Sequence, residues 1–317
     1  MKALTILLLA PASAGAFSLT FPVDCTLTET CFIQQYVDHD PGPQARDFTC
    51  GPLSYDGHKG TDIAVPTLAD MEKGVTVRAA AAGTVRATRD GLPDIMANAP
   101  DAPDINGQDC GNGVVLAHPE GWETQYCHLK RGSIKVRQGQ SVSIGTPLGQ
   151  IGLSGNTEFP HLHLSLRHNG QVVDPFSPTD IASCDAPAPS LFSPALPFQP
   201  GGLISVGFGP AIPSFDAVKS GTAVNARLPQ TAPVLALWAH LFGTRAGDRL
   251  IFTLTGPDGK ILHETVTLSK TQARAMRTIG KRRPPKGWPK GSYTGIVAHQ
   301  RGVETLGQKA VTVEILP

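Results

Sequence analysis

The sequence has almost no net charge and no long hydrophobic run. Its 317 residues include 27 lysines and arginines against 26 aspartates and glutamates. Because neither sign is in excess, no global field attracts the chain to nucleic acid or to an anionic membrane. The apolar run from Ala3 to Ala10 is too short to span a bilayer, which takes about 20 residues, and no later segment approaches that length. We therefore expect no nucleic-acid partner and no membrane span in the mature chain.

The first residues, 1–16, have the three parts of a secretory signal peptide. Lys2 supplies the positive charge, Ala3 to Ala10 form the apolar segment, and small residues fit cleavage after Ala14 or Ala16. A retained membrane anchor is the alternative interpretation of the same segment. We expect removal of residues 1–16, which would leave the mature chain periplasmic or secreted.

Two familiar metal-binding patterns are missing. There is no C-x-x-C pair, and His263-Glu264 is followed by Thr-Val-Thr, so the helical H-E-x-x-H zinc motif is excluded. Six cysteines in an exported chain are more typical of three disulfides than of a zinc ribbon. We expect one of these bonds to join Cys110 and Cys127, because a hairpin turning at residues 119–121 would bring them together.

Short strand patterns dominate both halves of the chain, and long helical periodicity is absent. Glycine-rich turns separate the strand patterns between residues 75 and 166, and Asn169-Gly170 is a hairpin signal because a type I′ turn needs two positive φ angles. A proline-rich segment precedes a second set of strand patterns. We predict an all-β chain, with an antiparallel β domain over residues 17–184, a linker over 185–202 and a small immunoglobulin-like β-sandwich over 203–317.

Two histidines lie two residues apart in the segment PHLHLSLRHNG. His161 and His163 fall on one probable strand, so both side chains leave the same face of it. They form either a hydrogen-bonded structural pair or one wall of a metal site.

Two further segments supply possible companions for this pair. In GHKGTDIAV, His58 precedes Asp62 by four residues, a span of about 13 Å in a straight strand, so sharing one ion requires a bend at Gly60. In ETQYCHLK, Tyr126 and His128 share one strand face. A lone histidine there would more often be structural, so His128 is a candidate site residue only because the other histidines accompany it.

Four segments together resemble the lysostaphin and LytM type of zinc metallopeptidase. They are residues 57–65, 111–129, 136–149 and 160–174, and their order and spacing follow that family over roughly residues 48–176. The resemblance implies an antiparallel β-sheet metallopeptidase domain. It also implies an exported zinc endopeptidase that hydrolyses peptide bonds in peptidoglycan cross-links or stem peptides.

The resemblance implies roles for five side chains. His58, Asp62 and His163 would bind zinc, while His128 and His161 would form a catalytic pair that does not bind it. Two imidazoles and one carboxylate leave the fourth tetrahedral position for water, whose pKa zinc lowers toward about 7. One histidine would accept the water's proton, and the other would stabilise the oxyanion or protonate the leaving amine. The sequence does not decide which histidine does which.

The sequence departs from the family pattern at two positions. Phe159 replaces the usual glycine before P-H-L-H, and Ser165 stands where an acidic residue is frequent. Neither change removes a ligand, but both bear on substrate fit and on the groups that support the site.

Two other functions are compatible with the same fold. One is a catalytically inert wall-binding or amidase-activating protein, and the other is a protease for secreted proteins. Inert relatives typically lack metal ligands, whereas all five positions are filled here, which favours the enzyme. The basic loop KRRPPKGWPK (residues 281–290) either contacts a wall polymer through the C-terminal domain or is a solvated surface loop.

Overall fold

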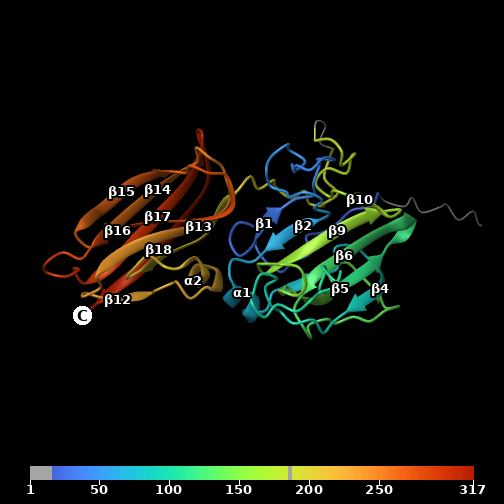
Figure 1. Ribbon diagram of the computed structural model, residues 1–317, viewed down its shortest axis with the longest axis horizontal. Helices are drawn as coiled ribbons and strands as arrows, with labels where there is room; N and C mark the ends of the chain where they lie inside the picture. The colour runs from blue at the N-terminus through green and yellow to red at the C-terminus, as the bar shows by residue number, and fades with distance from the viewer. Residues whose placement is uncertain (1–15, 185–187) are drawn as a thin grey trace, which may run out of the picture.

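The computed structural model describes residues 16–184 and 188–317. The expected signal peptide lies outside the described residues apart from residue 16, and the proline-rich segment is described from residue 188 onward. Within the described chain, no helix has the length and apolar character that a membrane crossing requires. The prediction of an all-β fold is confirmed, since strands dominate and the α-helices described are the short α1 (Leu68–Lys73) and α2 (Phe215–Ser220) (Figure 1).

The first half of the chain forms one large antiparallel sheet. Its strand order is β1-β2-β9-β6-β5-β4-β7, with β10 pairing with β9. The strands are β1 (Phe32–Gln35), β2 (Thr61–Ala64), β4 (Gly83–Arg89), β5 (Asn112–Ala117), β6 (Trp122–Leu129), β7 (Ser141–Val142), β9 (His161–His168) and β10 (Gln171–Val173). A small antiparallel sheet of β3 (Thr76–Arg78) and β8 (Pro147–Gln150) lies beside them.

The β5–β6 hairpin confirms the expected disulfide. The two strands turn through a 3₁₀ segment, Pro119–Gly121. Cys110 is bonded to Cys127, and their Cα atoms are 4.7 Å apart. Two further disulfides join Cys25 to Cys31 and Cys50 to Cys184.

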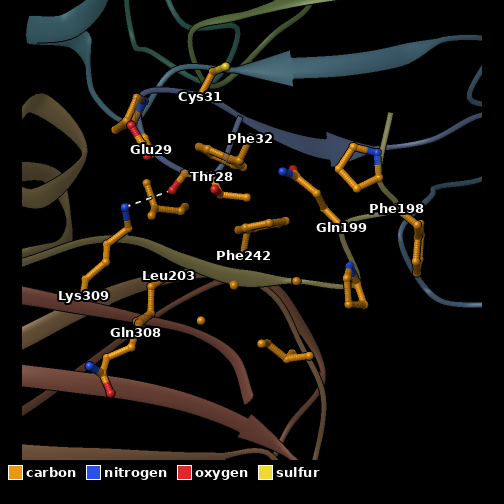
Figure 2. A pocket seen from close by; sticks show the side chains of 18 residues that line it. Thr28, Glu29, Cys31, Phe32, Phe198, Gln199, Leu203, Phe242, Gln308 and Lys309 are labelled. Atoms are coloured by element: carbon orange, nitrogen blue, oxygen red, sulfur yellow. Dashed lines mark hydrogen bonds between the residues drawn. The ribbon is translucent and has the colours of Figure 1, made fainter. Parts of the chain in front are cut away.

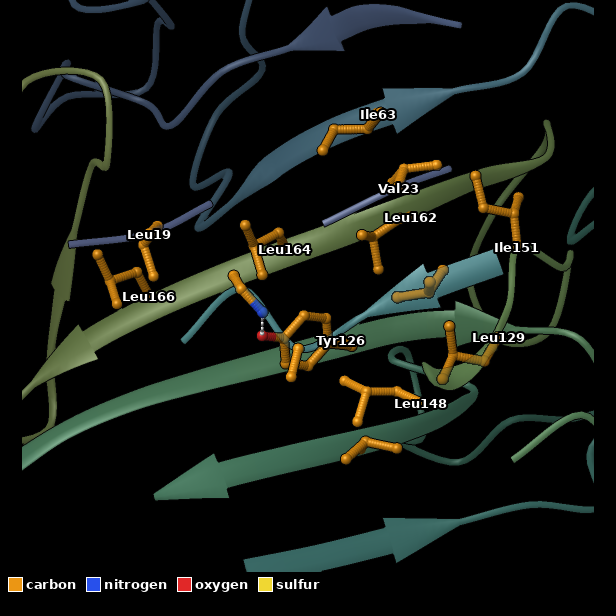
Figure 3. Close-up of a cluster of buried hydrophobic side chains, with 14 of the residues drawn as sticks. Leu19, Val23, Ile63, Tyr126, Leu129, Leu148, Ile151, Leu162, Leu164 and Leu166 are labelled. Atoms are coloured by element: carbon orange, nitrogen blue, oxygen red, sulfur yellow. Dashed lines mark hydrogen bonds between the residues drawn. The ribbon is translucent and has the colours of Figure 1, made fainter. Parts of the chain in front are cut away.

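Alternation along β9 separates the core from the site. Leu162, Leu164 and Leu166 are fully buried and point into the hydrophobic core, where Figure 3 shows them beside Tyr126. Because successive strand residues face opposite sides, His161, His163 and Ser165 must lie on the other face of the sheet. The hydrophobic pattern of one strand therefore fixes which face carries the histidines.

The second half forms two sheets around a second core. The first contains β11 (Gly202–Gly209), β13 (Val234–Thr244) and β16 (Gln272–Arg282). The second contains β12 (Arg227–Pro229), β18 (Glu304–Leu316), β17 (Gly291–Arg301), β14 (Arg249–Gly256) and β15 (Gly259–Thr267). Buried residues from both sheets share one cluster, so this half is a β-sandwich. All of its strand pairs are antiparallel except β12–β18, which is parallel.

The two halves contact each other next to β1. The Phe32 and Phe242 rings lie 4.7 Å apart, and the Gln34 side chain donates a hydrogen bond of 3.0 Å to the Ala273 carbonyl oxygen. The proline-rich segment also packs on the first half, because Phe192 is buried in its core and Gln199 accepts a hydrogen bond from the Ile33 N–H. A cavity of about 430 Å³ lies among these contacts (Figure 2).

Candidate metal centre

Strand pairing brings the first two candidate ligands together. In the β2–β9 ladder, Asp62 is the register partner of His163. His58 lies in the turn before β2, and its Nε2 is 3.1 Å from Asp62 Oδ1. Gly60 between them is needed for close approach, because a Cβ at that position would lie 2.5 Å from His163 Nε2. The glycine that the sequence marked as a bend therefore also makes room for the second histidine.

Three ligand atoms converge at this point. His163 Nδ1 lies 2.8 Å from Asp62 Oδ1 and 3.2 Å from His58 Nε2. Tetrahedral zinc with bonds of about 2.0–2.1 Å would separate its ligand atoms by about 3.3 Å. The three atoms thus already have nearly the spacing that zinc requires, and the donor set of two imidazoles and one carboxylate suits that ion.

The remaining ring nitrogens fix which atoms face inward. His58 Nδ1 lies 2.6 Å from the Tyr36 carbonyl oxygen, which can only accept, so Nδ1 carries the proton. His163 Nε2 lies 3.0 Å from Ser165 Oγ, which can accept its proton. With these tautomers, two imidazole lone pairs and a carboxylate oxygen face one another. Such an arrangement of acceptors is stabilised by a cation.

His128 and His161 form the opposite side of the site. Their ring centroids are 4.6 Å apart, and His161 Nε2 lies 3.4 Å from Asp62 Oδ1. His128 Nδ1 lies 2.8 Å from the Ser154 carbonyl oxygen, and His161 Nδ1 lies 2.9 Å from the Phe159 carbonyl oxygen. Both histidines therefore donate from Nδ1 and keep Nε2 for chemistry.

Burial and mutual charge shift the pKa values in this cluster. Burial, reinforced by the charges of His161 and His163, holds the pKa of His128 well below its usual value. Burial also lowers the pKa of His163, against the opposing effect of Asp62. For Asp62, burial would raise the pKa, but the charges of His58 and His161 and hydrogen bonds from the histidines hold it well below the usual range. The cluster therefore favours an ionised Asp62 carboxylate beside neutral His128 and His163, whereas the pKa of His58 is raised because the attraction of Asp62 outweighs its burial.

All five residues singled out from the sequence meet in this one site. His163 belongs to both possible ligand groups, one with His58 and Asp62 and one with His128 and His161. Only the first group contains a carboxylate. Sequence reasoning missed the groups that orient the rings, because Tyr36, Ser154 and Phe159 act through backbone carbonyls, which leave no trace in residue type.

The comparison with family models matches residues 56–175 to Peptidase family M23. Among curated proteins, DD-carboxypeptidase/endopeptidase Mpg of Neisseria meningitidis is 34% identical over 122 residues, covering 38% of this chain and 22% of that protein. Peptidoglycan DD-endopeptidase ShyA of Vibrio cholerae is 35% identical over 117 residues, covering 37% and 22%. Cell division protein DipM of Caulobacter vibrioides is 39% identical over 72 residues, covering 23% and 12%.

A solved structure gives a similar partial match. The crystal structure of a zinc containing peptidase from Vibrio cholerae is 24% identical, with a TM-score of 0.34, and the match covers 54% of this chain and 41% of that one. The chain spans less than a quarter of the length of the three curated relatives above. The family-model match, residues 56–175, spans the segment that carries the site.

Proposed function

We propose, from the premise that residues 56–175 belong to peptidase family M23, that this chain is an exported zinc endopeptidase of peptidoglycan. The bonds it would hydrolyse are peptide bonds in cross-links or stem peptides. The observation that carries the proposal is the convergence of His58, Asp62 and His163 within 2.8–3.2 Å of one another, with two buried histidines opposite. A complete set of this kind favours an enzyme over an inert wall-binding or amidase-activating protein.

In this proposal His58 Nε2, Asp62 Oδ1 and His163 Nδ1 hold the metal. Zinc bound there would acidify a water molecule and polarise the scissile carbonyl. His128 and His161 exchange protons through Nε2, because their Nδ1 protons are committed to backbone carbonyls. The low pKa of His128 keeps its imidazole neutral near neutral pH, so its Nε2 lone pair is free.

The proposal places the chain in the cell envelope, with residues 17–184 as the peptidase domain and residues 203–317 as a separate sandwich. Three disulfides, with no free cysteine among the described residues, suit an oxidising compartment. A wall contact through the sandwich would use the exposed Lys281, Arg282 and Arg283, since Trp288 of the same loop is buried and donates to the Ala232 carbonyl oxygen.

Elemental analysis of the purified mature chain, run beside a peptidoglycan digestion resolved by mass spectrometry, tests the proposal. We expect one zinc per chain and new free amines from cleaved cross-links. His163→Ala should lose zinc and activity, whereas His161→Ala should keep zinc and lose most activity. His168→Ala, on the same strand but stacked on Trp122, is the matched control and should change neither.

Three results would contradict the proposal in different ways. Equal zinc loss in His163→Ala and His161→Ala would overturn the ligand assignment. Absence of zinc with intact muropeptides would favour the inert protein. Cleavage of casein alone would reassign the substrate to secreted proteins.

A further inference from the structure

A side chain of the C-terminal sandwich reaches the edge of the metal centre. Arg274 lies on β16, and its guanidinium carbon is 5.1 Å from the centre of the Phe159 ring. Phe159 also stacks on His161, with ring centroids 4.4 Å apart and planes inclined by 22°. Phe159 therefore contacts both a guanidinium from one half of the protein and a histidine of the candidate site in the other half.

Phe159 also holds His161 through its backbone. Its carbonyl oxygen lies 2.9 Å from His161 Nδ1 and also accepts a hydrogen bond of 2.9 Å from Thr157 Oγ1. The ring and the carbonyl of one residue thus restrict the same imidazole in two ways. The carbonyl sets the tautomer, and the ring limits the tilt of the imidazole plane.

Two of the three guanidinium nitrogens of Arg274 lack a polar partner among the described residues. Its Nε and Nη2 atoms are inaccessible to solvent and lack a hydrogen-bond partner among the described residues. Burial lowers the pKa of Arg274 to about 10, which still leaves it charged at neutral pH. Burying an unpaired cation is costly. The contacts that remain to offset that cost are the faces of Phe159 and, at 5.9 Å, Phe32.

The strand that carries Arg274 is tied to the peptidase half. Gln34 on β1 donates a hydrogen bond of 3.0 Å to the carbonyl oxygen of Ala273, the neighbour of Arg274. Phe32 on the same strand packs against Phe242 of the sandwich, with Phe159 at the edge of that cluster. These contacts between the two halves place Arg274 beside Phe159.

We propose that Arg274 is a positioning residue, which clamps Phe159 against His161 so that the C-terminal sandwich sets the orientation of a catalytic imidazole. This inference rests on the proposed endopeptidase function. It gives the sandwich a direct part in catalysis, separate from any wall contact. The guanidinium and the imidazole both contact the Phe159 ring, so the position of the ring couples the two groups.

Two variants each remove one of the groups in these ring contacts. Arg274→Met keeps the length of the side chain but removes the charged plane, and Phe159→Leu removes the ring but keeps the backbone carbonyl. Phe159→Tyr keeps the ring and should restore function. Arg277→Met is the matched control, because that guanidinium hydrogen-bonds to Met276 and Gln272 of its own strand.

For the zinc-loaded full chain acting on a soluble cross-linked muropeptide, we expect Arg274→Met to lower kcat by about tenfold with KM changed less than twofold. Phe159→Leu should do the same, and the double variant should be no slower than the slower single variant. The thermal midpoint of Arg274→Met should not fall, because the variant removes a partly buried charge with two unpartnered nitrogens. A purely structural role would instead lower the midpoint together with activity.

The histidine ring signals give a readout that does not depend on turnover. In carbon-13 histidine-labelled protein, the His161 ring protons should shift in Arg274→Met and in Phe159→Leu, because the stacked ring of Phe159 shields them. Phe159→Tyr and Arg277→Met should leave them in place. This measurement still tests the clamp if the wild-type chain proves unable to cleave peptidoglycan.

Four results would overturn the inference. The first is an unchanged His161 signal in Arg274→Met, and the second is an unchanged kcat. The third is a raised KM at constant kcat, which would make Arg274 a contact for a substrate carboxylate. The fourth is a double variant whose loss equals the product of the two single losses, which would show that the two residues act independently.

Discussion

Ser165→Ala should weaken zinc binding because Ser165 selects the tautomer of His163. Ser165 Oγ lies 3.0 Å from His163 Nε2, and Asp62 Oδ1 lies 2.8 Å from His163 Nδ1. The ring therefore has two stable tautomers. One donates from Nε2 to Ser165 and offers Nδ1 to a metal, and the other donates from Nδ1 to Asp62 and cannot bind a metal through that atom.

The size of the change in zinc affinity depends on whether the zinc-bound or the zinc-free protein loses the hydrogen-bond acceptor of His163. Without the Ser165 hydroxyl, the metal-binding tautomer leaves a buried N–H unsatisfied, at a cost of about 1–3 kcal/mol. The metal-free protein avoids this cost by adopting the tautomer that donates to Asp62. The whole penalty then falls on the bound state and raises the zinc Kd by about 5-fold to about 150-fold.

A competition titration against a fluorescent zinc chelator near neutral pH measures this change. Ser133→Ala is the control, because Ser133 is similarly buried but accepts its hydrogen bond from the Gln150 N–H in the small sheet. Ser165→Asp should bind zinc at least as tightly as the wild type, since a carboxylate accepts the Nε2 proton more strongly. A Kd for Ser165→Ala within twofold of the wild type would refute the tautomer argument.

Two further predictions concern stability. The Cys50–Cys184 bond spans 134 residues and the Cys25–Cys31 bond spans 6, so the chain-entropy estimate assigns them about 5 and about 2 kcal/mol. Serine substitution of the first pair should lower the free energy of unfolding in urea by about 3 kcal/mol more than substitution of the second, and equal losses would contradict the estimate. His240 is fully buried, and burial with the charges of Arg274 and Lys219 lowers its pKa to about 2, whereas the unfolded chain takes up this proton at about pH 6.5. Between these two pH values the unfolded state binds more protons than the folded state. The free energy of unfolding therefore falls as the pH drops below about 6.5, by about 1.4 kcal/mol per pH unit from this residue. The free energy of unfolding of His240→Leu should fall less steeply with pH than that of the wild type, and equal slopes would exclude His240 as the cause.

Local patterns predicted the strands better than their partners. The alternation in β9 correctly separated core leucines from histidines, and Asn169 and Gly170 have φ angles of 50° and 81°, as a type I′ turn requires. The parallel pairing of β12 with β18 had no local signal. Strand partners that are distant in sequence depend on which edges meet after folding, and residue periodicity does not encode that choice.

The same distinction applies to the site. The five candidate residues were recognisable because their side chains have the right chemistry and spacing. The groups that orient the histidine rings were not recognisable, because they are backbone carbonyl oxygens, those of Tyr36, Ser154 and Phe159. Arg274 was missed for a different reason, because it comes from the other half of the chain and has no motif around it.

The disulfide predicted from the β5–β6 hairpin also bears on the orientation of His128. His128 has φ = 59°, in the left-handed region, which costs a non-glycine residue about 1–3 kcal/mol unless its surroundings hold it there. Its N–H donates to the Cys110 carbonyl oxygen at 2.8 Å, and its own carbonyl accepts from the Gly152 N–H at 3.0 Å. Cys110 is in turn bonded to Cys127, the residue before His128. One cross-link therefore fixes both the chain leading into His128 and the acceptor of its amide proton, so it holds the imidazole in the site as well as closing the hairpin.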